Sequence, residues 1–257
     1  MLTPPEIARS LLATGESKAR LPFGKMLLLA ILAGAYIALA GVGATAAAVT
    51  VESGSLAKLL SACVFPAGLS MVILAGSELF TGNCLMVMAL LERRITPAQL
   101  LRNWLTVYLG NAMGGAAVAA LAVYSHTASL FGDGLARSMV SIAESKAALG
   151  AGDAFLRGVL CNFLVCLAVW MAAASKRAEG KVIALFFPIL LFVLCGYEHC
   201  IANLYYLPAG AFAAAEYGVE TMLTLAGCLE NLAAVTLGNL VGGAALGVGY
   251  RFAYLKE

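Results

Sequence analysis

Charged side chains are scarce in this sequence. Asp, Glu, Lys and Arg together account for 12% of its 257 residues, whereas hydrophobic residues account for 62%. The mean hydropathy of +0.92 lies far above that of a soluble globular domain. A net charge of only +2, without an arginine-rich face, also argues against binding to nucleic acid. The composition therefore predicts an integral membrane protein whose partners include the lipid bilayer but no nucleic acid.

The sequence also lacks the residue patterns that enzymes and metal proteins need. It contains two histidines, and its seven cysteines follow neither a zinc-ligand spacing nor a disulfide framework. No His/Asp cluster or nucleophile motif is present. We therefore expect no metal, no cofactor and no enzymatic activity, and we interpret the cysteines as small buried hydrophobic residues.

Long stretches without charge are what the sequence does contain. A helix needs roughly 20 apolar residues to cross a bilayer core of about 30 Å. Six such segments can be counted, and the second and fifth are unusually long, with Glu78 and Glu198 interrupting them. The six segments cover residues 26–51, 59–91, 103–132, 158–175, 182–215 and 231–250.

Basic residues are distributed unevenly between the two sides that these segments define. If the N-terminus is cytoplasmic, only four basic residues lie outside the cell, namely Lys58, Arg137, Lys146 and Arg157. The other twelve are Arg9, Lys18, Arg20, Lys25, Arg93, Arg94, Arg102, Lys176, Arg177, Lys181, Arg251 and Lys256. The positive-inside rule thus predicts a multi-pass protein of the inner (plasma) membrane with both termini in the cytoplasm.

The N-terminal residues 1–24 are polar and predict a short amphipathic helix. Thr3 and Glu6 have the spacing of a capping box, with proline at the first helical position. Ile7 and Leu12 then fall on one face. We expect this helix to lie along the inner surface of the membrane; a frayed tail is the alternative. No cleavable signal peptide is expected.

An internal repeat relates the two halves of the chain. NWLTVYLGNAMGGAA (103–117) and NLAAVTLGNLVGGAA (231–245) share Asn, Val, Leu-Gly-Asn, Gly-Gly and Ala-Ala at one constant offset, which is close to half the chain. This offset predicts a single domain, 1–257, made of two halves of three helices each, 25–132 and 133–257. Because three crossings is an odd number, the second half enters the membrane from the opposite side, which gives an inverted repeat.

The two interrupted segments contain the same pattern, Gly-x-Glu, at residues 76–78 and 196–198. A carboxylate inside a membrane is costly, and glycine beside it favours a broken helix. A break leaves backbone N–H groups without helical partners. We therefore predict that Glu78 and Glu198 accept hydrogen bonds from those N–H groups, a structural role.

His199 directly follows the second of these glutamates. It is the only histidine within a predicted broken membrane helix. An imidazole in this position can donate a hydrogen bond or a proton to a passing anion. A purely structural histidine is the alternative.

Three segments resemble a known family, the formate/nitrite transporters. They are ILAGSELFTG (73–82), GVLCNFLVCLA (158–168) and EHCIANLYYLPAG (198–210). The resemblance implies an aquaporin-like fold of six transmembrane helices, with the second and fifth broken. It also implies a homopentamer with one pore in each protomer, which conducts small monovalent anions such as formate, nitrite or hydrosulfide.

The same resemblance assigns roles to individual residues. It places a polar centre between two hydrophobic constrictions, a mobile loop at residues 78–83 and a basic residue that attracts anions at the outer vestibule. The centre comprises His199, Thr81, Asn162 and Asn203; the outer constriction Phe65, Val165 and Phe192; the inner constriction Leu69, Leu79 and Phe80; and the vestibule Lys146.

The predicted function is therefore a membrane channel for small monovalent anions or their conjugate acids. An aquaporin-like channel for water or small neutral solutes is the alternative, but the paired Asn-Pro-Ala boxes of such channels are absent. A purely structural membrane protein would have no reason to break two helices at buried glutamates.

Overall fold

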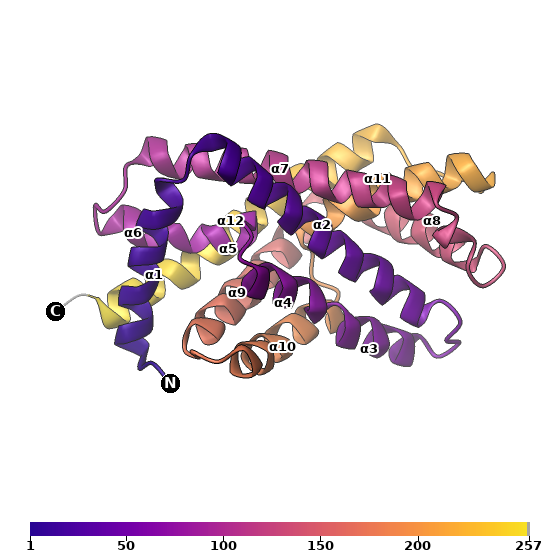
Figure 1. Cartoon of the computed structure of the whole chain (residues 1–257). Helices are drawn as coiled ribbons and strands as arrows, with labels where there is room; N and C mark the ends of the chain where they lie inside the picture. Colours follow the sequence, from indigo (N-terminus) through magenta and orange to yellow (C-terminus); the bar gives the residue numbers. More distant parts are fainter. Residues whose placement is uncertain (256–257) are drawn as a thin grey trace.

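The computed structural model describes residues 1–255, whose regular secondary structure is helical without any strand (Figure 1). The predicted second half extends to 257, so its last two residues, with Lys256 of the basic set, lie outside the described residues. The helices are α1 (Pro4–Ala19), α2 (Phe23–Ala48), α3 (Gly54–Val64), α4 (Pro66–Ala75), α5 (Phe80–Asn83), α6 (Val87–Leu91), α7 (Pro97–Tyr124), α8 (Gly134–Ala147), α9 (Ala151–Ala173), α10 (Ala178–Leu194), α11 (Cys200–Tyr217) and α12 (Leu225–Tyr254). Two short 3-10 turns, η1 (Cys84–Met86) and η2 (Thr127–Ser129), complete the described chain.

Within residues 1–255, five helices are long and apolar enough to cross a membrane. They are Phe23–Ala48, Gly54–Ala75 (α3 and α4 taken together), Pro97–Tyr124, Ala151–Ala173 and Leu225–Tyr254. Helix α7 also shows how the surface is built, because Leu101, Leu105 and Leu109 form an exposed apolar stripe along one helical face. The chain is therefore a membrane protein.

The corresponding helices of the two halves pack in the same way. Helix α2 packs along α7, and α9 packs along α12. Glycines allow this close approach: a Cβ on Gly114 of α7 would overlap the carbonyl oxygen of Ile31, and one on Gly242 of α12 would overlap that of Val159. Gly114 and Gly242 are equivalent positions of the repeat, so its glycines are helix-packing positions in both halves.

The chain leaves the helical conformation at corresponding points of the two halves. Gly76 and Gly196 adopt the left-handed conformation, with φ of 80° and 69°. The next N–H group, of Ser77 or Tyr197, then donates back across five residues to Val72 or Phe192, as in a Schellman motif.

The following helix of each half begins after an extended residue. Leu79 precedes α5 and His199 precedes α11, both with β-region dihedrals. Leu79 and His199 therefore occupy corresponding positions in the two interruptions.

Helix α1 begins with the predicted capping box, in which the carboxylate of Glu6 accepts from the Thr3 backbone N–H at 2.7 Å. Its apolar residues Ile7, Ala8 and Leu12 are buried in a cluster with residues of η1 and α6. The apolar face of this helix is therefore covered by the protein itself. In Figure 1, α1 and the C-terminal end of α12 lie at the same end of the molecule, and α8 lies toward the other.

Candidate functional site

The two interruptions meet through a side-chain contact. His199 Nε2 lies 3.0 Å from the hydroxyl oxygen of Thr81, and both residues are buried. The other ring nitrogen of His199, Nδ1, accepts a hydrogen bond from the backbone N–H of Ala202 at 3.0 Å, which caps α11. Because Nδ1 is the acceptor, Nε2 carries the ring hydrogen and donates to Thr81.

Asn111 on α7 holds the first interruption. Its Oδ1 accepts from the backbone N–H of Phe80 at 3.0 Å. Its Nδ2 donates to the carbonyl oxygens of Ala30 at 2.7 Å and Glu78 at 2.9 Å. A single amide side chain thus satisfies backbone groups on both sides of the interruption.

Asn239 on α12 does the same for the second interruption. Its Oδ1 accepts from the backbone N–H of Cys200 at 2.9 Å. Its Nδ2 donates to the carbonyl oxygens of Gly158 at 2.8 Å and Glu198 at 2.9 Å. The prediction that glutamate carboxylates accept from the freed backbone N–H groups is therefore wrong, since two asparagines fill that role.

The Glu78 carboxylate belongs to a polar cluster instead. It accepts from Lys18 Nζ at 2.7 Å and from Asn83 Nδ2 at 2.8 Å. The same Asn83 amide donates to Asn103 Oδ1 at 2.9 Å, and Lys18 also donates to Asn83 Oδ1. A lysine from the N-terminal helix therefore compensates the buried charge.

An equivalent cluster surrounds the Glu198 carboxylate. It accepts from Lys146 Nζ at 2.9 and 3.0 Å and from Asn203 Nδ2 at 2.7 Å. Asn203 also donates to Asn231 Oδ1, and Asn231 donates to the Lys146 carbonyl. Lys146, predicted as the anion-attracting residue, is thus bound to a carboxylate.

The remaining polar candidate, Asn162, supports the centre from α9. Its Nδ2 donates to the carbonyl oxygens of Asn239 at 2.6 Å and Thr81 at 3.3 Å. It therefore connects Asn239, which holds the second interruption, to the backbone of Thr81, whose side chain contacts His199. In contrast, the Oδ1 atom of buried Asn203 has no hydrogen-bond partner among the described residues.

The residues predicted for the outer constriction gather beside His199. The rings of Phe65 and Phe192 lie 5.7 Å apart at 87°, and the Phe192 ring lies 5.8 Å from the imidazole. Val165 is buried in the same hydrophobic cluster. The Phe192 ring of α10 thus stacks beside the imidazole, and Phe65 at the α3–α4 junction packs edge-on against Phe192.

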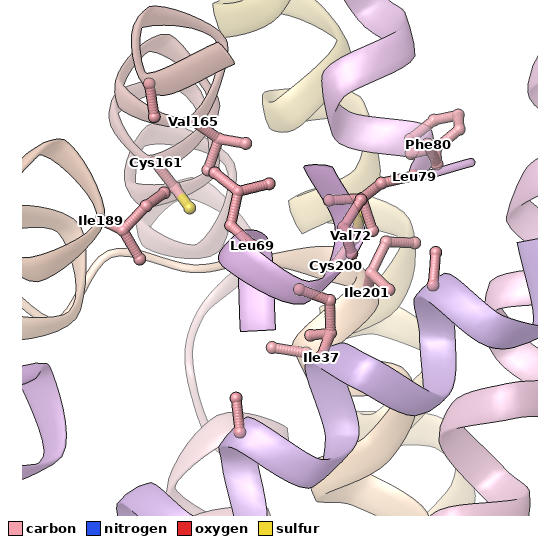
Figure 2. Packing of buried hydrophobic residues seen from close by; sticks show 14 of the residues in the cluster. Ile37, Leu69, Val72, Leu79, Phe80, Cys161, Val165, Ile189, Cys200 and Ile201 are labelled. Carbon is pink, nitrogen blue, oxygen red and sulfur yellow. The ribbon is translucent and has the colours of Figure 1, made fainter. Parts of the chain in front are cut away.

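The residues predicted for the inner constriction separate into two groups. Leu69 and Leu79 line a cavity, whereas Phe80 does not. The Phe80 ring packs edge-on against Trp104 and Tyr108, at centroid distances of 6.4 and 5.1 Å, and Figure 2 shows it projecting away from Leu69. The structure therefore assigns Phe80 to packing against α7.

Two cavities approach this centre from opposite ends of the molecule. The α1-side cavity, of about 770 Å³, is lined by residues that include Lys18, Glu78 and Leu79. The α8-side cavity, of about 370 Å³, is lined by residues that include Phe192 and His199. The His199 side of the His199–Thr81 contact lines the α8-side cavity, and Leu79 and Gly82, which flank Phe80 and Thr81 in the chain, line the α1-side cavity.

Comparison with known proteins identifies the family. Residues 5–253 match the family described as "Formate/nitrite transporter". The chain belongs to this family. The resemblance of the sequence motifs is thereby confirmed across nearly the whole chain.

Relatives in this family are named as channels and transporters rather than enzymes. The chain is 38% identical to a "Probable formate transporter" of Methanothermobacter thermautotrophicus, and the match covers 99% of this chain and 98% of the relative. It is 39% identical to the "Formate channel FocA" of Haemophilus influenzae, over 86% of this chain and 84% of the relative.

Solved structures of the formate/nitrite transporter family share the fold. The chain superposes on an "FNT family ion channel" with a TM-score of 0.88 and 31% identity, covering 96% of this chain and 98% of the other. The corresponding values for a "Pentameric formate channel with formate bound" are 0.80, 33%, 91% and 98%.

The sequence analysis missed Lys18, Asn83, Asn103, Asn111, Asn231 and Asn239 as members of the site. A signal for them exists, because the offset that relates the two matched segments also relates Lys18 to Lys146 and Asn111 to Asn239. The asparagines other than Asn83 lie within the matched segments themselves, so interpreting the shared polar residues of these segments as site members, and applying the same offset to Lys18, would have indicated all but Asn83.

Proposed function

We propose that the chain is a channel for small monovalent anions or their conjugate acids, with formate, nitrite and hydrosulfide as candidates. Each protomer of a homopentamer contains one pore. The names of its relatives support formate, and its likeness to a solved pentameric formate channel supports the pentamer. The observation that carries the proposal is the His199–Thr81 contact of 3.0 Å between two cavities.

This contact supplies hydrogen-bond donors at an otherwise apolar point. An anion that loses water in a low-dielectric passage pays a large desolvation cost. The Nε2–H of His199 and the hydroxyl of Thr81 offset part of that cost by donating to the anion. The pair satisfies itself when no anion is present, so neither buried group is left without a partner.

Hydrogen-bond donation is favoured over proton donation by the tautomer. A neutral imidazole that gave its Nε2 proton to an anion would become an imidazolate, which is a strong base. A doubly protonated ring would place an Nδ1–H against the backbone N–H of Ala202. The arrangement therefore supports a histidine that donates a hydrogen bond while keeping its proton.

The proposal includes six membrane crossings. Helices α2, α7, α9 and α12 each cross once, the α3–α4 segment crosses together with α5 and α6, and α10 crosses together with α11. The excess of basic residues at the α1 end supports a cytoplasmic location for that end and for both termini, in an inner (plasma) membrane.

The test is anion conduction by the purified protein in planar bilayers. Reversal potentials under formate, nitrite and hydrosulfide gradients should follow the permeant anion, and His199→Phe should abolish conduction. Osmotic swelling of liposomes in water and glycerol distinguishes an aquaporin-like channel. Swelling without anion conduction, or unchanged conduction in His199→Phe, would contradict the proposal.

A further inference from the structure

The α8-side cavity is lined by more positive than negative charge. Three basic residues, Lys58, Lys146 and Arg157, line it, and Glu198 is its one carboxylate within the described chain. Lys146 is bound to that carboxylate at 2.9 Å, so these two charges offset each other. The positive charge that remains belongs to Lys58 and Arg157.

Lys58 and Arg157 approach the second interruption from two different helices. Lys58 lies on α3, and a Cβ added to Gly196 would be 4.0 Å from its Nζ. Arg157 lies on α9, and its carbonyl oxygen accepts from the backbone N–H of Glu198 at 3.3 Å. Both side chains are exposed, and across residues 1–255 neither forms an ion pair.

We infer that Lys58 and Arg157, rather than Lys146, form the site that collects anions at the α8-side mouth. A cavity within a low-dielectric protein focuses the field of uncompensated charges and raises the local concentration of counter-ions. This site rests on the proposed function, since it delivers the same anions to His199.

Lys146 has a different role in this arrangement. Its ammonium holds Glu198 and its carbonyl accepts from Asn231, so it compensates a buried carboxylate next to the interruption. Removing Lys146 would leave the Glu198 carboxylate without its cation and disturb the fold. Removing the side chain of Lys58 or Arg157 breaks no hydrogen bond within the described residues.

The test compares formate conductance at two ionic strengths in planar bilayers. At about 10 mM salt the screening length is about 30 Å, and at about 1 M it is about 3 Å. The double variant Lys58→Gln/Arg157→Gln should lose about tenfold in conductance at low salt, within the range of electrostatic focusing. At high salt it should conduct like the parent, which also shows that it is folded.

Matched variants make the result specific. Arg137→Gln removes one exposed positive charge on α8 from outside this cavity and should leave the low-salt conductance unchanged, as should the charge-retaining pair Lys58→Arg/Arg157→Lys. An equal loss in Arg137→Gln, a loss that persists at high salt, or no loss in the double variant would overturn the inference. A parent protein that conducts no formate at any salt would instead refute the proposed function.

Discussion

Asn111 and Asn239, which occupy the same position in the two repeats, make the same three hydrogen bonds at the two helix interruptions. Each accepts from the first N–H of the new helix and donates to two carbonyl oxygens. The backbone of each interruption is therefore held by an asparagine of the last helix of its half, α7 or α12. The carboxylates of Glu78 and Glu198 do not bond it.

Asn111→Leu should destabilise the protein strongly. It leaves the buried Phe80 N–H and Glu78 carbonyl without the partners that Asn111 supplies, and each unsatisfied group costs about 1–3 kcal/mol. Thermal unfolding of the detergent-solubilised protein would show a lower Tm, with Leu109→Ala on the exposed face of α7 as the control. Equal Tm values for Asn111→Leu and the parent would contradict the role of Asn111 in stabilising the interruption.

The Lys18–Glu78 pair predicts a non-additive result. Lys18→Met leaves the Glu78 carboxylate without its cation and should cost about 1–3 kcal/mol, less than a fully buried pair because the Lys18 side chain is 24% exposed. Adding Glu78→Gln should restore part of the loss. Unfolding by chemical denaturant measures both effects, and a double variant less stable than the single one would contradict this interpretation.

Substitutions at Thr81 distinguish the role of its hydroxyl group from that of its packing. Thr81→Val keeps the shape but removes the partner of His199 Nε2, so formate efflux from liposomes should fall about tenfold, the equivalent of roughly 1.4 kcal/mol. Thr81→Ser retains the hydroxyl and should stay close to the parent rate. Similar rates for the valine and serine variants would show that the hydroxyl is not used.

Leu79 and Phe80 are neighbours that should respond differently. Leu79→Ala widens the α1-side cavity and should admit larger anions such as acetate. Phe80→Leu removes the edge contacts with Trp104 and Tyr108, each worth about 0.5–1.5 kcal/mol, and should lower stability without changing selectivity. A change of selectivity in Phe80→Leu would place its ring in the pathway after all.

The hydrogen bonds of Glu144 should make the ordering of the loop at Thr221 and Met222 depend on pH. Its carboxylate accepts from the Met222 N–H and the Thr221 hydroxyl, and these hydrogen bonds hold the pKa of Glu144 below its ordinary value of 4.5. The ionised form is the bonded form, so the contact is complete above the ordinary pKa and is lost as the pH falls through the lowered pKa. A protection factor at the Met222 amide, taken relative to the intrinsic exchange rate at each pH, that falls in acid below the ordinary pKa should report this loss, and Glu144→Gln should show weakened protection already at neutral pH.

Local sequence chemistry was sufficient for part of this architecture. The composition predicted the membrane class, and the signature segments predicted the family, both of which are confirmed. Gly76 and Gly196 mark the points where helices end because a left-handed residue there suits glycine. These signals are contained within a few neighbouring residues.

The partners of the buried carboxylates depend on tertiary structure instead. Lys18 lies 60 residues from Glu78 along the chain, and Lys146 lies 52 residues from Glu198. Each lysine was interpreted from its side of the membrane or from the family resemblance alone. Only the packing of α1 and α8 against the interruptions shows that both ammonium groups are already bound.

The correspondence between Leu79 and His199 gives the passage a chemical direction. The backbone of one half repeats that of the other, but the residue before the new helix is apolar in the first half and an imidazole in the second. In the proposed channel, an ion arriving from the α8 end meets the ring nitrogen before the leucine, and one arriving from the α1 end meets them in reverse order. The two halves thus share a backbone arrangement but present different side chains at their interruptions, which makes the proposed path polar toward one end.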